Sequence, residues 1–129
     1  ILSYTHLFDA IVDRSDGDTL RVRGAPTNNF SIWGKYTFTE GLLENFSFGA
    51  GMIISSSYLG REREGNKYFL EDGYTTFDAL VEYKIPVGED HRLKVSLNLK
   101  NLTDERYFSG GVGSPAENRR AMLTVKYDF

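Results

Sequence analysis

The chain has 129 residues and a formal net charge of −3, so it amounts to one domain or less and lacks the basic excess of a nucleic-acid-binding protein. The absence of cysteine excludes a disulfide framework and thiolate metal sites, and no apolar run approaches the roughly 18 residues of a transmembrane helix. The 8 Tyr, 9 Phe and 13 Gly, against 3 Pro, are typical of an all-β protein with many turns.

The chain opens in a strand pattern. Residue 1 is Ile rather than Met and no export signal precedes it, so we expect that the start of a longer protein is missing. The first predicted strand, about Leu2 to Val12, is irregular because Leu7 and Ile11 fall on its otherwise polar side. His6 lies in this strand.

Five further segments alternate between apolar and polar residues. Side chains along a strand point to opposite faces with a period of two, so each segment predicts a strand with one apolar face. The apolar residues are every second position of 30–38, 46–54, 77–85, 93–99 and 121–129. No segment shows a sustained helical period. The sequence therefore predicts an antiparallel meander of about six strands.

The last segment shows the pattern most clearly. Its apolar face carries Ala121, Leu123, Val125, Tyr127 and Phe129, and mostly polar residues lie between them. Its length suits a tilted membrane-crossing strand, which needs roughly 9–11 residues. The terminal strand of a soluble sandwich can alternate in the same way, so this segment alone does not decide between the two.

Long and short connections alternate along the meander. Residues 13–28, 56–73 and 105–118 are long, charged and rich in Gly, Asn and Ser, whereas 39–45 and 86–91 are short. Outer-membrane barrels have short periplasmic turns and long external loops. If the chain ends at the periplasm, all three long loops fall outside and both short turns inside. A soluble sandwich has no reason to separate loop lengths in this way, so the pattern favours a transmembrane antiparallel β-barrel segment.

The two faces of the predicted strands also favour lipid over a dry core. Aromatic residues gather near strand ends, as the interfacial girdles of membrane barrels require. The opposite faces carry charged residues that would line a wet lumen: Lys35, Asp78, Glu82, Lys84, Lys94, Lys100, Lys126 and Asp128. In an ordinary half-buried sheet they would instead form the solvent-facing surface.

Four segments resemble elements of TonB-dependent outer-membrane receptors, in the order and spacing of that family. They are Asn29-Phe30-Ser31-Ile32-Trp33; Gly73 to Tyr83 (GYTTFDALVEY); Asn101 to Phe108 (NLTDERYF), which is similar to the family's N-L-x-D-x-x-Y element; and the terminal strand from Arg119-Arg120 to Phe129. The resemblance implies that residues 1–129 are the C-terminal part of a large barrel of about 22 strands. Nothing in the chain resembles the plug domain or the TonB box of the family.

A piece of this size cannot form a pore by itself, because the smallest outer-membrane barrels have about eight strands and open sheet edges are untenable in lipid. We therefore expect it to need the rest of the receptor, another copy of itself or a non-membrane setting. The expected sheet pairs Ala121–Phe129 with Leu93–Leu102. Its apolar residues should be exposed because their solvent is lipid: Phe77, Val81, Val95, Leu97, Leu123 and Val125.

The resemblance implies a receptor of the bacterial outer membrane that takes up a ferric siderophore or a similar metal chelate. It implies the TonB complex, outer-membrane lipids and the barrel-assembly machinery as partners, with no nucleic acid, cofactor, bound metal or enzymatic activity. Two alternatives stay open. One is a small structural or adhesive barrel assembled from several chains, and the other is an outer-membrane enzyme in which His6 acts with Ser3 or Ser31.

Candidate ligand-binding residues lie in the predicted external loops. They are Tyr58, Arg61, Arg63, Lys67, Tyr68 and Phe69 in the middle loop, and Tyr107, Phe108, Arg119 and Arg120 around the last one. Basic side chains attract anionic chelates over long distances, and aromatic rings pack on aromatic chelating groups. The simpler interpretation makes residues 61–64 a solvated, self-neutralising stretch and Tyr107 and Phe108 girdle residues. By the same resemblance, Tyr127 and Phe129 carry the assembly signal.

Overall fold

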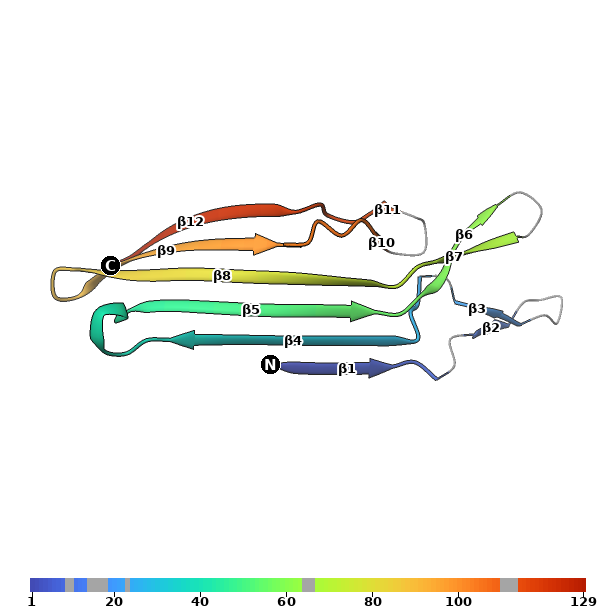
Figure 1. Cartoon of the computed structure of the whole chain (residues 1–129), viewed down its shortest axis with the longest axis horizontal. Helices are drawn as coiled ribbons and strands as arrows, with labels where there is room; N and C mark the ends of the chain where they lie inside the picture. Colours follow the sequence, from blue (N-terminus) through green and yellow to red (C-terminus); the bar gives the residue numbers. More distant parts are fainter. Residues whose placement is uncertain (9–10, 14–18, 23, 64–66, 110–113) are drawn as a thin grey trace.

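Six strands form one antiparallel sheet in which neighbours in space are also neighbours along the meander. The computed structural model describes residues 1–8, 11–13, 19–22, 24–63, 67–109 and 114–129. The strands of the sheet are, in spatial order, β1 (Leu2–His6), β4 (Asn28–Thr37), β5 (Phe46–Ser55), β8 (Tyr74–Val87), β9 (His91–Lys100) and β12 (Arg120–Asp128) (Figure 1). The predicted all-β meander is confirmed.

The connections divide between the two ends of the sheet. Short turns join β4 to β5, through the 3₁₀ turn η1 (Gly41–Leu43), and β8 to β9 (Figure 1). The three long connections lie at the opposite end and contain two-stranded hairpins. These are β2 (Ile11–Asp13) with β3 (Thr19–Arg21), β6 (Tyr58–Arg63) with β7 (Lys67–Glu71), and β10 (Phe108–Ser109) with β11 (Ser114–Pro115). We call the two ends the short-turn end and the loop end.

The predicted length of the first strand, about Leu2 to Val12, was wrong. The sheet strand β1 ends at His6, and Ile11–Asp13 instead pairs with β3 in the first loop hairpin. Leu7 still donates its backbone N–H to Thr27, at 2.8 Å, so the pairing with the segment before β4 ends just beyond the strand. The break coincides with the two residues that fell on the wrong face, Leu7 and Ile11.

The strand register sorts side chains into apolar and polar rows that cross the sheet. Leu123 lies opposite Leu97, which lies opposite Val81, and the row continues through Phe48 to Tyr36. One residue further along, a polar row runs through Thr124, Ser96, Glu82, Ser47 and Thr37. As expected, β12 pairs with β9, from Arg120 opposite Lys100 to Asp128 opposite Arg92. We call the apolar side the outer face and the polar side the inner face.

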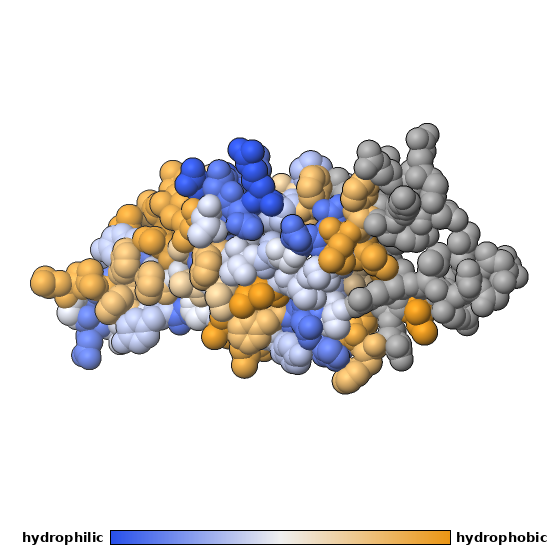
Figure 2. Space-filling model, turned by 45° about the vertical axis from the view of Figure 1, so that its right-hand side comes forward, coloured by the Kyte–Doolittle hydropathy of each residue, from blue (hydrophilic) through white to orange (hydrophobic). Residues whose placement is uncertain are grey.

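Burial is inverted relative to a soluble protein. On the inner face Ser47, Thr76, Glu82 and Ser96 are buried, whereas on the outer face Leu123 is 66% exposed. Of the six apolar residues expected to be exposed, Phe77, Leu97, Leu123 and Val125 are exposed, and Val81 and Val95 are half-buried. In the described part of the chain, every extensive contact of a strand in the large sheet is with a neighbour in that sheet, so no second sheet packs on the outer face. Figure 2 shows apolar side chains spread over the molecular surface.

No helix in the described segments is long and apolar enough to span a membrane.

Candidate ligand-binding loop end and inner face

The loop end of β9 is closed by Asn101, whose side chain is buried. Its Oδ1 accepts a hydrogen bond from the Glu105 backbone N–H at 2.9 Å, and its Nδ2 donates to the carbonyl of Glu105 at 2.8 Å and to that of Glu117 at 3.3 Å. Asn101 has φ of 50°, in the left-handed region that Asn tolerates better than most residues. One amide side chain therefore connects the two ends of the last long loop.

Asp104 continues this closure. It also has a left-handed backbone, with φ of 54°, and its Oδ1 accepts a hydrogen bond from the Arg119 backbone N–H at 3.0 Å. The Asn and the Asp of the N-L-x-D segment thus have a physical role: each combines a left-handed backbone with a side-chain acceptor, as Asn and Asp do in turns. Together they guide the chain out of β9 and back into β12.

Asp78 on β8 joins this cluster to the neighbouring strand. Its Oδ1 accepts from the Asn101 backbone N–H at 3.0 Å, and its Oδ2 accepts from Lys100 Nζ at 2.6 Å. The backbone N–H of Leu102 bonds the Phe77 carbonyl at 2.8 Å. At the loop end, therefore, each inner-face carboxylate and lysine named here has a partner inside the chain.

Tyrosines attach the middle loop to the last one. The Tyr58 hydroxyl, at the start of β6, donates to the Phe108 carbonyl at 2.5 Å, and Tyr58 is only 3% exposed. The rings of Tyr74 and Tyr107 stack with centroids 3.8 Å apart. Burial raises the pKa of both Tyr58 and Tyr107 above the usual tyrosine value, with smaller contributions from nearby charges, Glu71 for Tyr58. Both hydroxyls therefore stay protonated at neutral pH.

Two open cavities lie beside these tyrosines. One of about 220 Å³ is lined by Glu71, Gly73 and residues 105–108. The other, of about 290 Å³, is lined by Arg106, Tyr107, Pro115 and Asn118, among others. Each is smaller than the roughly 300–1,000 Å³ typical of a small-molecule site. By their size, they are parts of a mouth rather than complete pockets.

The predicted ligand-binding residues of the middle loop differ in their exposure. Tyr58 is buried at the base of the loop with its hydroxyl bonded to backbone, whereas Phe69 on β7 is exposed. Arg61 and Arg63 lie on β6, and Lys67 and Tyr68 lie on β7. The side chains of these four lie outside the described residues, so ligand contact by them stays a prediction.

The predicted residues at the two ends of the last strand interact with nearby residues of the chain. Arg120 pairs with Glu117 through contacts of 2.9 and 3.0 Å, and Arg119 is held by its backbone bond to Asp104. At the other end of β12, Tyr127 stacks on His91 with centroids 5.8 Å apart, and the ring of Phe129 lies 6.3 Å from that of Tyr127. Both aromatic residues of the predicted assembly signal are exposed.

The Ser–His arrangement required by the enzyme alternative is not formed. In β1, Ser3 pairs with Ser31 on the inner face, whereas His6 belongs to the outer face with Leu2 and Tyr4. The Nδ1 atom of His6 lies 2.6 Å from Oδ1 of Asn28, and its ring contacts Phe8 edge to face. Among the described residues, no group of three or more His, Asp and Glu side chains gathers to hold a metal ion.

Sequence reasoning missed the roles of four residues of the inner face and loop end. The roles of Asn101, Asp78 and Tyr74 depend on contacts across strands and loops that no local pattern shows. The fourth residue is Trp33, whose indole lies across Gly49 and Gly51 of β5: a Cβ atom on Gly51 would lie 2.1 Å from Trp33 Cε3. The alternation of Gly49 and Gly51 on one face of a strand was the available signal, because strand glycines often mark close approach of another group.

Comparisons with known proteins fit this architecture. A family described as "TonB dependent receptor-like, beta-barrel" matches residues 1–102. The chain is 27% identical over 107 residues to the ferric-pyoverdine 358 receptor of Pseudomonas putida, which covers 81% of this chain and 12% of that protein. It is 34% identical over 85 residues to the ferrioxamine B receptor of Salmonella typhimurium, covering 66% of this chain and 12% of that receptor.

A further relative and a solved structure extend the similarity. The metal-pseudopaline receptor CntO of Pseudomonas aeruginosa is 30% identical over 116 residues, covering 84% of this chain and 15% of that receptor. The structure of FpvA of P. aeruginosa with an iron-loaded heterologous pyoverdine superposes with a TM-score of 0.77 at 22% identity, over 98% of this chain and 17% of that one. The chain thus spans less than a fifth of the length of these proteins.

Proposed function

Because the chain belongs to the TonB-dependent receptor β-barrel family, we propose that it supplies about the last six strands of an outer-membrane receptor that takes up a ferric siderophore or a similar metal chelate. The observation that carries the proposal is the six-stranded sheet with an exposed apolar outer face and a polar inner face. That sheet is one part of a barrel wall, with lipid outside and a wet lumen inside.

The ligand-binding role falls to the loop end. Long loops on one side of a barrel form its external mouth, and here the middle and last loops are attached to each other by Tyr58 and by the stack of Tyr74 on Tyr107. Phe69 on β7 is exposed, and Arg119 supplies positive charge at the base of the last loop, next to Arg120, which is paired with Glu117. Aromatic contact together with Coulomb attraction suits an anionic, aromatic chelate.

The remaining parts of the proposed receptor lie outside residues 1–129. A plug domain would fill the lumen and carry the contact with the TonB complex, which supplies energy for uptake. Assembly would use the barrel-assembly machinery, with Tyr127 and Phe129 as the terminal signal. In this proposal the protein is a transporter and catalyses no reaction, which agrees with the separation of His6 from Ser3 and Ser31.

The test uses the full-length receptor in its native bacterium under iron limitation. Deletion of the receptor should abolish growth on one ferric chelate of a panel while growth on the others continues, and deletion of TonB should abolish the same growth. Retention of growth on every chelate would contradict the proposed uptake. Recovery of a mass near 14.6 kDa that cross-links only to copies of itself would favour the assembled small barrel instead.

The loop residues can be tested separately once a chelate is found. Phe69→Ala should weaken binding of the chelate about tenfold, whereas Leu70→Ala, at the adjacent exposed position on the other side of β7, should not. Arg119→Gln has Arg92→Gln as its matched control, because Arg92 lies at the short-turn end. Equal effects of a variant and its control would remove that residue from the site.

A further inference from the structure

Two polar residues, His6 and Asn28, lie directly opposite each other at the loop end of the outer face. The other described positions of that face on the six strands are apolar, Gly or Tyr, except for Thr75 and His91. A polar group that faces lipid costs free energy unless it has hydrogen-bond partners. This pair therefore calls for partners, and the chain supplies some of them.

The side chain of Asn28 is held by its neighbours. Its Oδ1 accepts a hydrogen bond from the Tyr4 hydroxyl at 3.0 Å, and Nδ1 of His6 lies 2.6 Å from the same oxygen. The Asn28 backbone N–H bonds Ser56 Oγ at 3.0 Å. Because an amide oxygen only accepts, Nδ1 of His6 carries the proton, and Nε2 of the neutral ring is an acceptor. We call Tyr4, His6 and Asn28 the polar cluster.

The polar cluster keeps both donors and acceptors for another molecule. In the described part of the chain, neither Asn28 Nδ2 nor His6 Nε2 has a hydrogen-bond partner, and the Tyr4 oxygen can still accept. No described outer-face position on the six strands is Lys or Arg. Hydroxyl groups both donate and accept, whereas a phosphate only accepts and pairs best with basic side chains. The cluster therefore suits a hydroxyl-rich group rather than a phosphate.

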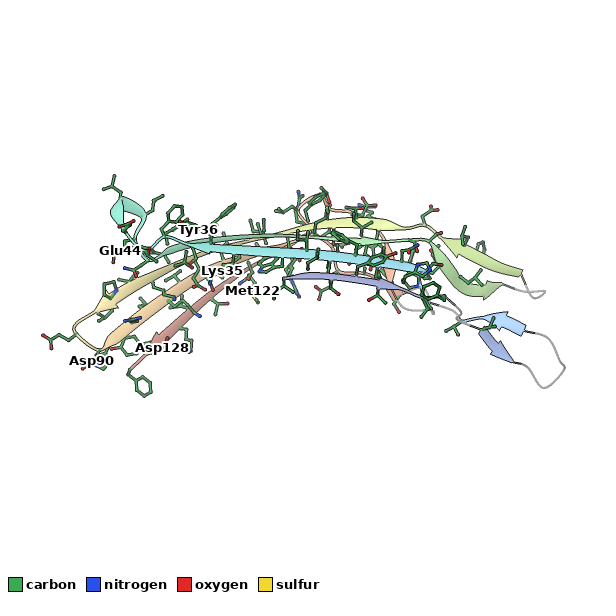
Figure 3. All side chains as sticks on the ribbon, turned by 90° about the horizontal axis from the view of Figure 1, so that it is seen from below. Lys35, Tyr36, Glu44, Asp90, Met122 and Asp128 are labelled. Atoms are coloured by element: carbon green, nitrogen blue, oxygen red, sulfur yellow. The ribbon has the colours of Figure 1, made fainter. Side chains whose placement is uncertain are left out.

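A hollow of about 450 Å³ lies on the same face, toward the middle of β4. Gly34 and Ala50 lie opposite each other in it, and a Cβ atom on Gly34 would meet nothing within 4 Å. Figure 3 shows Tyr36, which shares the outer face with Gly34, on the side of the sheet opposite Lys35. The hollow therefore faces lipid. Its large outer-face side chains are Leu2, Ile32, Met52 and Phe77.

The spacing between the polar cluster and the hollow matches the depth of one lipid leaflet. Asn28 and Gly34 are six residues apart on β4, which is about 20 Å along a strand. A strand tilted by about 40° descends about 15 Å over that length, or half of a hydrocarbon core about 30 Å thick. A lipid whose headgroup lies at the polar cluster therefore brings the end of an acyl chain to the hollow.

We propose that the polar cluster and the hollow bind one glycolipid of the external leaflet, with its saccharide hydroxyls at the cluster and an acyl chain in the hollow. The proposal rests on the proposed barrel, because only there does the outer face meet lipid. Unselective contact with lipid requires neither an amide held in place nor a hollow in the wall. A few placed polar groups beside an apolar cavity are the composition of a site that selects one molecule.

Native mass spectrometry of the full-length receptor, released from outer membranes in mild detergent, tests the headgroup contact. The wild type should retain one glycolipid, and the double variant His6→Leu with Asn28→Leu should retain at least tenfold less. Thr75→Val is the matched control, because Thr75 is also polar and lies at the loop end of the same face, and it should retain the wild-type amount. Equal retention by the double variant and the control, or retention of a phospholipid instead, would overturn the proposal.

The hollow is tested by filling it. Gly34→Leu should lower glycolipid retention about threefold or more, because the new side chain occupies the space of the acyl chain. Ala121→Leu adds the same side chain in the same cross-sheet row, four strands away, and should change nothing. The heat-dependent gel shift of folded barrels confirms that each variant assembles. Unchanged retention in the Gly34 variant would contradict an acyl chain in the hollow.

Chemical protection separates a lipid from its free headgroup. The full-length receptor in phosphatidylcholine vesicles is treated with diethyl pyrocarbonate, which modifies histidine, and mass spectrometry follows His6 and His91. Added purified glycolipid should protect His6 about fivefold and leave His91, at the short-turn end, reactive. Equal protection of His6 by the saccharide without acyl chains, or by inorganic phosphate, would mean that the site does not select a lipid, and the proposal would fail.

None of these measurements uses a ferric chelate. A receptor that takes up no chelate can still retain the glycolipid, and a receptor that takes up a chelate can lack it. Failure of the glycolipid site and failure of the proposed function are therefore distinguishable.

Discussion

The two faces of the sheet differ in which side chains they expose: apolar ones are exposed on the outer face, and polar ones are buried on the inner face. On the outer face, large apolar side chains such as Leu123 and Val125 are exposed, and no second sheet packs on them in the described part of the chain. On the inner face, small or charged polar side chains such as Ser47 and Glu82 are buried among hydrogen bonds and ion pairs. The order of a soluble protein is reversed.

This difference shows where the specific contacts of the chain lie. Lipid accepts any apolar side chain, so the outer face requires hydrophobicity and little detailed fit. The inner face must satisfy each buried polar group, because a buried group without a partner costs about 1–3 kcal/mol. Among the described residues that are not exposed, every buried side-chain nitrogen or oxygen has a hydrogen-bond partner. Substitutions should therefore act through solvation outside and through particular partners inside.

The largest effect should come from a charge on the outer face. Leu123→Arg, near the middle of β12, should lower the free energy of unfolding of the receptor in lipid by about 2–4 kcal/mol. This is the cost of a charge at the bilayer midplane. Thr124→Arg, at the same depth on the inner face, should cost less than about 1 kcal/mol, because its charge reaches the lumen. Reversible urea unfolding in lipid vesicles measures both. Equal costs would remove the distinction between the faces.

Asn101 tests how much the polar network contributes at the loop end. Asn101→Ala removes three side-chain hydrogen bonds and leaves a left-handed backbone, so we expect a local loss of about 2–3 kcal/mol. Hydrogen exchange of the amides in residues 105–109 and 114–118 reports the loss. Asn101→Gly keeps the backbone conformation accessible and separates the two causes. Unchanged exchange in both variants would contradict a closing role for Asn101.

Glu82 tests the inner face in the middle of the sheet. Glu82→Gln keeps the size of the side chain and removes the charge that Lys35 and Lys94 share, so we expect a loss of about 1–2 kcal/mol in vesicle unfolding. Tyr83→Phe, at the next residue on the outer face, is the control and should change stability by a few tenths of a kcal/mol. A larger loss for the control would mean that the outer face also depends on specific partners.

The smallest expected effect is at Tyr58, the buried aromatic residue that departs from the inverted pattern. Tyr58→Phe removes the bond to the Phe108 carbonyl and should loosen the last loop by about 1 kcal/mol, seen as faster proteolysis of that loop at pH 8.

Tyr58 also predicts a pH dependence. Burial raises the folded pKa of Tyr58 above the ordinary tyrosine value of about 10, so its contribution is fully present below that value and is lost as the pH rises through the folded pKa. The wild type should show this alkaline loosening of the loop and the Phe variant should not. The same alkaline step in both would assign it to another group.

Much of the fold was predictable because lipid outside and water inside impose a simple two-residue code on the sequence. That code identified β4, β5, β8, β9 and β12 and the pairing of the last two strands. It was wrong at the first strand, where Leu7 and Ile11 broke the alternation and the chain left the sheet after His6. The hairpins within the long loops were not predicted, because short strands outside the membrane have no second face to bury.

The candidate site was less predictable than the fold, because it lies in the loops, where the two-residue code does not apply. Sequence patterns place Tyr58, Phe69, Arg119 and Arg120 in loops, but which of them is free depends on contacts between loops. In the structure the Tyr58 hydroxyl donates a hydrogen bond to a backbone carbonyl 50 residues further along the chain, and Arg120 forms an ion pair with Glu117. The alignment of Lys84, Lys94 and Lys126 across three neighbouring strands likewise appears only in the register of the sheet.

The separation of short turns from long loops has a consequence for how such a chain can change. Each of the hairpins β4–β5 and β8–β9 has its register fixed by its short turn, and a shift of one residue would move every side chain to the wrong face. At the other end, lengthening a loop costs only about 0.6 kcal/mol per doubling and moves no strand residue. Insertions can therefore accumulate on the external side, and the outer mouth can diversify while the wall keeps its alignment.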